Sequence, residues 1–421
     1  MFKIALRVLI CLSVILFSYH IEFKATQASK IEGASKVRLS WSAVPDAVMY
    51  EFIVISKSSD KGRKTLKTET IITYSDIYAP GVEVELATIN ADPKTLWWQV
   101  RALNSDKKPI SSFSSPRRLN DGEPDPSSPL ATARLESFPA AKLYQAYSWI
   151  PVLGADSYEV QILSAKQMDH TPEVIKSLTV SGGRSFDLYD ETAYTQEGAY
   201  WWRVQAKDSS GNPVGNWSEA LPFTVKHGGF KVAAFGDSIT HGGGAISNPP
   251  SDPAYDWTTY TGFPVKNLGH SGDTTSMMNT RFEKEVLPFA PKLLVVMGGI
   301  NDLRGGAAAE DVINNLREIK EKCQEHGITP IFATVTPVNP DVIKKVFNQE
   351  TEASWQSERI KVNNWIKDQE FYVDVAPLLT GPDGLLPHLA AADGLHPDTK
   401  GKAQIGKKIG RYLKKNFGEN I

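Results

Sequence analysis

The first half of the chain contains the same pattern of residues twice. Leu39-Ser40-Trp41 recurs as Tyr147-Ser148-Trp149, and Trp97-Trp98-Gln99-Val100 recurs as Trp201-Trp202-Arg203-Val204. Trp41 and Trp149 are 108 positions apart, and Trp98 and Trp202 are 104 apart. A repeat of this length indicates two copies of one domain, because the units of a solenoid are much shorter.

Within each copy the apolar residues alternate with polar ones. Trp98, Val100 and Ala102 share one face of a strand, as do the equivalent Trp202, Val204 and Ala206, and this period of two is typical of half-buried strands. We expect two all-β sandwich modules, at residues 34–119 and 137–226, that resemble fibronectin type III or related Ig-like modules. Residues 120–136 are rich in Pro and Ser, which predicts an exposed linker between them.

From residue 229 onward, short apolar runs alternate with helical patterns. Residues 293–297 are apolar throughout, as expected of a parallel strand buried on both faces. Further strands are predicted at residues 231–235, 328–335 and 371–375, and helices at residues 310–326, 354–369 and 399–417. This alternation predicts a doubly wound α/β domain over residues 229–421, with functional residues at the carboxyl ends of its strands. We expect this domain to fold on its own.

Two short motifs in the α/β region carry the residue types of acyl transfer. Gly236-Asp237-Ser238 directly follows the first predicted strand, and Asp393-Gly394-Leu395-His396 precedes the last predicted helix. Together they supply a serine nucleophile, a histidine base and a carboxylate that orients the histidine. Each motif also has an ordinary explanation, as a turn serine or as a histidine near a helix start.

Two more blocks lie between these motifs, His270-Ser271-Gly272-Asp273-Thr274 and Gly299-Ile300-Asn301-Asp302. The four blocks in this order resemble the SGNH (GDSL) hydrolase family over about residues 229–417. The resemblance implies a three-layer α/β/α, flavodoxin-like fold and an ester hydrolase with the catalytic residues Ser238, Asp393 and His396. It also implies an oxyanion hole formed by the N–H groups of Ser238 and Gly272 and by the Asn301 side chain.

The loops of the α/β region bear on the identity of the substrate. Residues 245–261, rich in Pro, Asp, Tyr and Trp, are a candidate substrate lip, where Asp256 and Trp257 would contact a sugar; a packed surface loop is the alternative. Neither this segment nor residues 381–392 forms a long apolar groove, which favours a short acyl group, such as acetyl, on a polysaccharide. The alternatives are a lipid-directed lysophospholipase or thioesterase, and a non-catalytic polysaccharide-binding protein.

The amino terminus indicates export. Lys3 and Arg7 precede an apolar run from Val8 to Tyr19, which predicts a signal peptide over residues 1–28, or alternatively an N-terminal membrane anchor. The formal net charge of −2 argues against a general nucleic-acid binder. No close His or Cys spacing predicts a metal site, and no motif calls for a cofactor.

Overall fold

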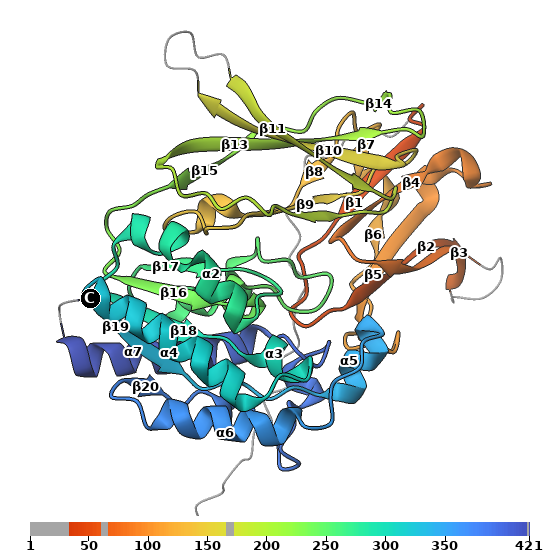
Figure 1. The fold of residues 1–421 in the computed structure, drawn as a ribbon. Helices are drawn as coiled ribbons and strands as arrows, with labels where there is room; N and C mark the ends of the chain where they lie inside the picture. Colours follow the sequence, from red (N-terminus) through yellow and green to blue (C-terminus); the bar gives the residue numbers. More distant parts are fainter. Residues whose placement is uncertain (1–32, 60–65, 166–171, 419–420) are drawn as a thin grey trace, which may run out of the picture.

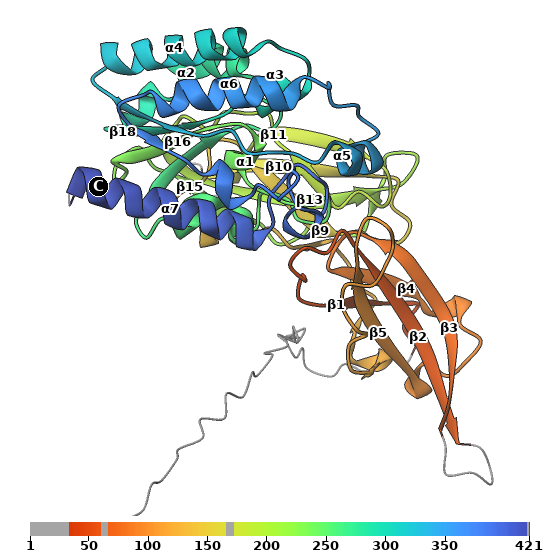
Figure 2. The same cartoon turned by 90° about the horizontal axis from the view of Figure 1, so that it is seen from below.

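The computed structural model describes residues 33–59, 66–165, 172–418 and 421 of the 421-residue chain. They form two β-modules followed by an α/β domain (Figure 1). The first module projects away from the rest, whereas the second packs on the α/β domain (Figure 2). The predicted signal peptide lies outside the described residues. Within the described ranges, no helix is both long enough and apolar enough to cross a membrane.

The first module is a sandwich of two antiparallel sheets. Its strands are β1 (Lys36–Ser40), β2 (Met49–Ser59), β3 (Leu66–Ile77), β4 (Gly81–Glu85), β5 (Leu96–Leu103), β6 (Arg117–Arg118) and β7 (Glu123–Pro124). The sheet orders are β4-β1-β7 and β3-β2-β5-β6. Trp98, Val100 and Ala102 are buried on one face of β5, whereas the residues between them are partly exposed, so the predicted alternation is confirmed.

The second module repeats this arrangement. Its strands are β8 (Leu130–Ala131), β9 (Ala146–Ile150), β10 (Ser157–Ala165), β11 (Pro172–Ser181), β12 (Asp187–Tyr189), β13 (Gly198–Lys207), β14 (Pro213–Val214) and β15 (Leu221–Val225). One sheet has the order β12-β9-β8, and the other has β11-β10-β13-β14, with β15 also paired to β13. The Tyr50 hydroxyl accepts a hydrogen bond from Val44 N in the first module, at 2.9 Å, and Tyr158 accepts the equivalent bond from Val152 N, also at 2.9 Å.

The segment predicted as an exposed linker is instead paired at its two ends with the two modules. Glu123–Pro124 forms β7 and pairs with β1, and Leu130–Ala131 forms β8 and pairs with β9. Between them, the Asp125 carboxylate accepts hydrogen bonds from the backbone and side chain of Ser35, both at 2.8 Å. Proline is tolerated at a sheet edge because it need not donate there, so a Pro-rich composition did not prevent pairing.

The α/β domain has a five-stranded parallel sheet in the order β17-β16-β18-β19-β20. The strands are β16 (Val232–Gly236), β17 (Val265–Gly269), β18 (Leu293–Met297), β19 (Thr329–Ala333) and β20 (Tyr372–Val373). The helices are α1 (Ser238–His241), α2 (Thr275–Glu285), α3 (Ile300–Arg304), α4 (Ala309–Glu325), α5 (Pro340–Phe347), α6 (Trp355–Lys367) and α7 (Thr399–Phe417). Helices α2, α4 and α6 lie on one side of the sheet and α7 on the other (Figure 2). The three-layer prediction is therefore confirmed.

The α/β domain and the second module share one hydrophobic core. Trp149 and Trp202 of the module and Phe235 and Leu268 of the domain belong to the same cluster of buried residues. Strand β17 also bonds directly to the segment before β9, where Lys266 Nζ donates to Ala141 O at 2.7 Å. The core of the α/β domain therefore continues into the second module, and independent folding of residues 229–421 stays a prediction.

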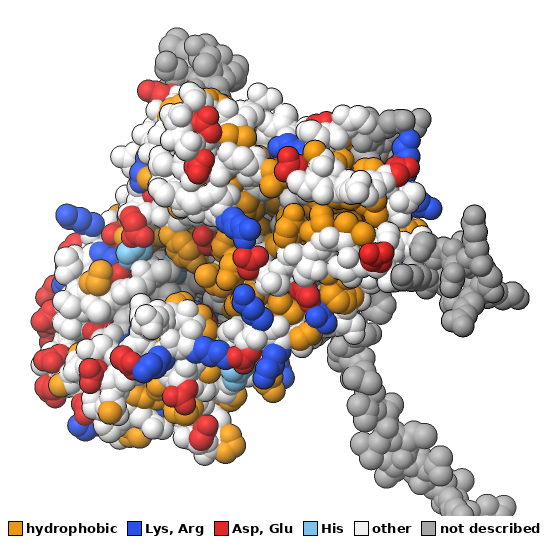
Figure 3. Space-filling model, turned by 90° about the vertical axis from the view of Figure 1, so that its right-hand side faces the viewer, with side chains coloured by type: hydrophobic (Ala, Val, Ile, Leu, Met, Phe, Trp, Pro, Cys, Tyr) orange, Lys and Arg blue, Asp and Glu red, His pale blue; other side chains and the backbone are white. Residues whose placement is uncertain are grey.

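A hollow of about 580 Å³ lies between the two β-modules. Figure 3 shows hydrophobic side chains gathered in such a hollow on this face of the molecule. Its lining includes Tyr78 of the first module, Leu153 and Phe186 of the second, and Ile246 of the α/β domain. All three parts of the chain therefore contribute to this hollow, which we call the inter-module cleft.

Candidate active site

Strand β16 delivers Ser238 to the carboxyl edge of the sheet. The strand ends at Gly236, and α1 begins at Ser238, directly after the helix cap Asp237. The Asp237 carboxylate accepts a hydrogen bond from Ile239 N at 2.9 Å, which holds the turn that presents the serine. Burial raises the pKa of Asp237 to about 7, although the Ile239 N–H and the nearby His396 favour its ionised form.

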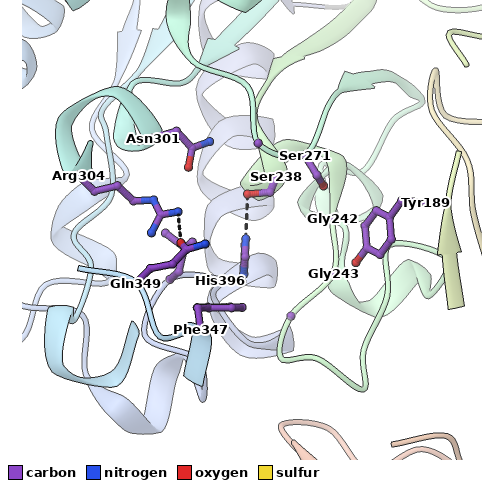
Figure 4. Close-up of a pocket in the computed structure, with 13 residues that line it drawn as sticks. Tyr189, Ser238, Gly242, Gly243, Ser271, Asn301, Arg304, Phe347, Gln349 and His396 are labelled. Carbon is purple, nitrogen blue, oxygen red and sulfur yellow. Dashed lines mark hydrogen bonds between the residues drawn. The ribbon is translucent and has the colours of Figure 1, made fainter. Parts of the chain in front are cut away.

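His396 and Asp393 reach Ser238 from the loop before α7. His396 Nε2 lies 2.8 Å from Ser238 Oγ (Figure 4), and His396 Nδ1 lies 2.8 Å from Asp393 Oδ2. An ionised carboxylate only accepts hydrogen bonds, so Nδ1 carries the proton and Nε2 is left to accept the serine hydroxyl. The other oxygen of Asp393 accepts from Leu395 N and His396 N, each at 2.8 Å. The structure thus brings together the three residues that the sequence singled out.

The expected oxyanion donors surround the same serine. Gly272 and Asn301 line one cavity of about 260 Å³ together with Ser238 and His396. Gly272 has a φ of +89°, a left-handed conformation that favours glycine. The N–H groups of Ser238 and Gly272 donate to no other group in the described part of the chain. Asn301 Nδ2 donates one hydrogen bond, to Asp273 O at 2.8 Å, and an amide nitrogen carries a second N–H.

A buried carboxylate fixes Asn301 relative to the loop that carries Gly272. Asp302 accepts hydrogen bonds from Thr275 N at 3.0 and 2.9 Å and from Thr275 Oγ1 at 2.6 Å. These bonds join the start of α3 to the start of α2. Asp302 is thus a positioning residue.

Asp256 and Trp257 are not in the cavity, which corrects the expectation that they contact substrate. Both side chains are 0 % exposed. The Asp256 carboxylate caps a short helix through Thr258 N, at 2.8 Å, and accepts a hydrogen bond from Asn267 Nδ2, also at 2.8 Å. Their segment packs against α7. Both residues are therefore part of the protein core and do not contact the substrate.

The cavity also contains residues that the sequence did not reveal. They are Tyr189 of β12, Ser271, Arg304 of α3, Phe347 at the end of α5, Gln349 and Leu395 (Figure 4). Tyr189 comes from the second β-module, and no local pattern connects it with Ser238. Arg304 could have been predicted from the sequence, because it follows Asn301 by three positions, and side chains at this spacing share one face of a helix. Among the described residues, no group of three or more His, Cys, Asp or Glu side chains is arranged to hold a metal ion.

His241 is a further histidine next to the site, and it is buried. Its Nε2 lies 3.0 Å from Tyr144 O, and its Nδ1 lies 2.8 Å from Ser271 Oγ. Burial, with a contribution from the positive charge of Lys142, lowers the pKa of His241 well below its usual value. The imidazole is therefore neutral and acts as a bridge between the second module and the cavity wall.

Comparison with known proteins finds a family model that matches most of the α/β domain. Residues 234–404 match the model of the GDSL-like lipase/acylhydrolase family. The "Uncharacterized lipoprotein YqeF" of Bacillus subtilis is 31% identical over 120 residues, which cover 25% of this chain and 49% of YqeF. The chain thus spans about half the length of this curated relative.

Several solved structures resemble this one. The lipase/acylhydrolase from Enterococcus faecalis is 25% identical, with a TM-score of 0.37, over 44% of this chain and 96% of that one. A catalytic mutant of an acetylxylan esterase from Geobacillus stearothermophilus is 20% identical, with a TM-score of 0.32, over 44% and 94%. By the family match, residues 234–404 form a GDSL-like lipase/acylhydrolase domain, which supports an ester hydrolase of the SGNH type.

Proposed function

We propose that the protein is an exported serine esterase that removes short acyl groups, chiefly acetyl, from a carbohydrate. The observation that carries the proposal is the continuous chain of hydrogen bonds from Ser238 through His396 to Asp393, with 2.8 Å at each step. A serine hydroxyl is a weak nucleophile until a base takes its proton. This geometry supplies the base and the carboxylate that orients it.

The reaction follows from these contacts. Ser238 Oγ forms a bond to the ester carbonyl carbon while its proton passes to His396 Nε2. Asp393 stabilises the resulting imidazolium, and the N–H groups of Ser238, Gly272 and Asn301 stabilise the oxyanion. The bond to the alcohol then breaks, and the alcohol leaves with the proton from His396. Water repeats the sequence on the acyl-enzyme, which releases the acid and restores Ser238.

The size and the lining of the cavity support a short acyl group. Its volume is about 260 Å³, and Gly242, Gly243 and Gly244 form part of its wall. A long acyl chain needs a continuous apolar wall, because each buried methylene contributes only about 0.8 kcal/mol. Export is supported by the amino-terminal sequence and by the word lipoprotein in the name of YqeF.

The inter-module cleft favours a second candidate, a lipid-directed esterase or thioesterase. The cleft holds about 580 Å³ and is rich in hydrophobic side chains, which is suitable for a long acyl chain. The sequence did not reveal this apolar surface, because most of it belongs to the two β-modules. The dependence of the hydrolysis rate on acyl chain length separates the two candidates.

Replacement of the nucleophile tests the chemistry. We expect Ser238→Ala in the full chain to abolish hydrolysis of 4-nitrophenyl acetate, with an unchanged circular dichroism spectrum. Ser276→Ala, at an exposed position of α2, is the matched control and should keep full activity. Full activity in Ser238→Ala would contradict the assignment of Ser238 as the nucleophile, whereas absence of hydrolysis in the wild-type protein would favour a non-catalytic, polysaccharide-binding role.

A further inference from the structure

Arg304 gives the active-site cavity a positive charge that no carboxylate in its lining balances. The lining residues are Tyr189, Ser238, Gly242, Gly243, Gly244, Ser271, Gly272, Asn301, Arg304, Phe347, Gln349, Leu395 and His396. Among them Arg304 is the only permanently charged residue. The cavity therefore presents a cation to whatever part of the substrate enters beside the scissile ester.

Most donor groups of Arg304 are unused. Among the described residues, its side chain donates one hydrogen bond, from Nη2 to Gln349 Oε1 at 2.8 Å (Figure 4), and forms no ion pair. Arg281, by contrast, pairs with Asp273 at 2.6 Å and with Glu285 at 2.9 Å. A guanidinium has five N–H donors, so Arg304 retains donors for a ligand.

The partly buried environment of Arg304 makes a guanidinium without a direct counterion energetically unfavourable. The residue is half-buried, and burial lowers its pKa, which the charges of Asp237 and Asp393 partly offset. A partly desolvated charge without a direct counterion is unfavourable unless a ligand completes it. Gln349 is neutral, so it orients the guanidinium without neutralising it.

Arg304 lies on the same helix as the proposed oxyanion donor Asn301. Arg304 and Asn301 lie three residues apart on α3, and this spacing puts both side chains on one face of a helix. Both line the cavity that contains Ser238. A group held by Arg304 would therefore lie next to the ester whose oxyanion Asn301 stabilises.

We propose that Arg304 binds an anionic group of the substrate, such as a carboxylate, and thus selects acidic esters. The inference rests on the proposed esterase function and names its substrate class. The planar fork of a guanidinium matches a carboxylate in a bidentate manner. The anion belongs either to the acyl part, as in a monoester of a diacid, or to the alcohol part, as in an acidic sugar.

Two pairs of substrates test the proposal and separate the two sources. On the alcohol side, 4-acetoxybenzoate is compared with neutral 4-acetoxybenzamide, and on the acyl side, monoethyl succinate is compared with ethyl butanoate. We expect the full-length protein to have the higher kcat/KM for the anionic member of one pair. Arg304→Gln should lower that value by roughly 10-fold to 100-fold, as expected for loss of a charge-assisted hydrogen bond, and should change the neutral member little.

Two further variants control for net charge and for the guanidinium itself. Arg317→Gln removes a charge from an exposed position of α4 and should leave the preference intact. Arg304→Lys should keep part of the preference. If Arg304→Gln fails to fold, product inhibition of the wild-type protein tests the same preference. We expect 4-hydroxybenzoate to inhibit hydrolysis of 4-nitrophenyl acetate more strongly than 4-hydroxybenzamide does if the anion is on the alcohol side, and succinate to inhibit it more strongly than butanoate does if the anion is on the acyl side.

Two results would overturn the inference. One is the absence of any preference for the anionic member in both pairs. The other is an equal loss on anionic and neutral esters in Arg304→Gln, which would mean that Arg304 orients the site through Gln349. Either result leaves the esterase proposal intact, since that proposal fails only if Ser238-dependent hydrolysis of the neutral esters is absent.

Discussion

The Lys142 ammonium of the second β-module lies 3.1 Å from the Asp256 carboxylate of the α/β domain, and both side chains are buried. Lys142 also donates hydrogen bonds to His241 O at 2.6 Å and to Pro250 O at 2.8 Å. These oxygens belong to the two ends of the loop that contains Gly242, Gly243 and Gly244 in the cavity wall. The second module thus holds part of the active site in place from within the core.

This ion pair gives the first prediction. Lys142→Met leaves Asp256 as an uncompensated buried charge, so we expect the free energy of unfolding to fall by about 3–5 kcal/mol. Denaturant unfolding of the full chain measures the loss. Arg134→Met is the control, because Arg134 forms an exposed ion pair with Asp252 across the same interface and should cost less than about 1 kcal/mol. Equal losses in both variants would contradict a special role of Lys142.

Lys266 gives a prediction on the pH dependence of stability. This side chain is 1% exposed, and burial lowers its pKa to about 7. Between pH 7 and the ordinary lysine pKa, near 10.4, the unfolded chain binds a proton that the folded chain has lost. Stability should therefore rise with pH across this window, because the cost of burying Lys266 is full below its folded pKa and is relieved as the pH rises towards the unfolded pKa.

A variant isolates this contribution. In Lys266→Met the rise between pH 7 and pH 9.5 should be smaller than in the wild-type protein, by up to a few kcal/mol. Chemical denaturation at a series of pH values measures the difference. Parallel curves for the two proteins would show that Lys266 keeps its ordinary pKa in the folded state.

Asn301 gives a prediction on the transition state. If its amide donates to the oxyanion, Asn301→Ala should lower kcat by about 10²–10³-fold with little change in KM. Steady-state kinetics on 4-nitrophenyl acetate measure both constants, and Asn314→Ala, at an exposed position of α4, is the control. A change confined to KM would mean that Asn301 binds the substrate and does not stabilise the transition state.

The sequence was most informative for functional residues that directly follow a predicted strand. Ser238 and Asn301 each follow a buried strand, and parallel strands bring their carboxyl ends to one edge, so their proximity could be predicted. Tyr189 could not be assigned, because it reaches the cavity from a separate β-module. Its place depends on how two domains pack, which leaves no local pattern in the chain.

Trp257 shows why a polar loop was misread. Its composition suggested an exposed lip, but the loop packs against α7 at a glycine. A Cβ at Gly406 would lie 2.1 Å from Trp257 O, so only glycine permits this approach. Glycine inside a helix is costly, and its presence in α7 was therefore a signal that another segment packs there.

The last prediction concerns the acyl chain. We expect kcat/KM on 4-nitrophenyl esters to be highest for acetate and to fall towards octanoate, because the cavity beside Ser238 holds only about 260 Å³. Ile246, which is 47% exposed, lines the inter-module cleft, and Ile246→Asp places a charge on that apolar surface. If long chains bind in the cleft, this variant should reduce octanoate hydrolysis far more than acetate hydrolysis. A wild-type maximum at eight carbons or beyond, abolished by Ile246→Asp, would move the assignment to the lipid-directed candidate, whereas an acetate maximum with equal effects on both esters supports the esterase for short acyl groups.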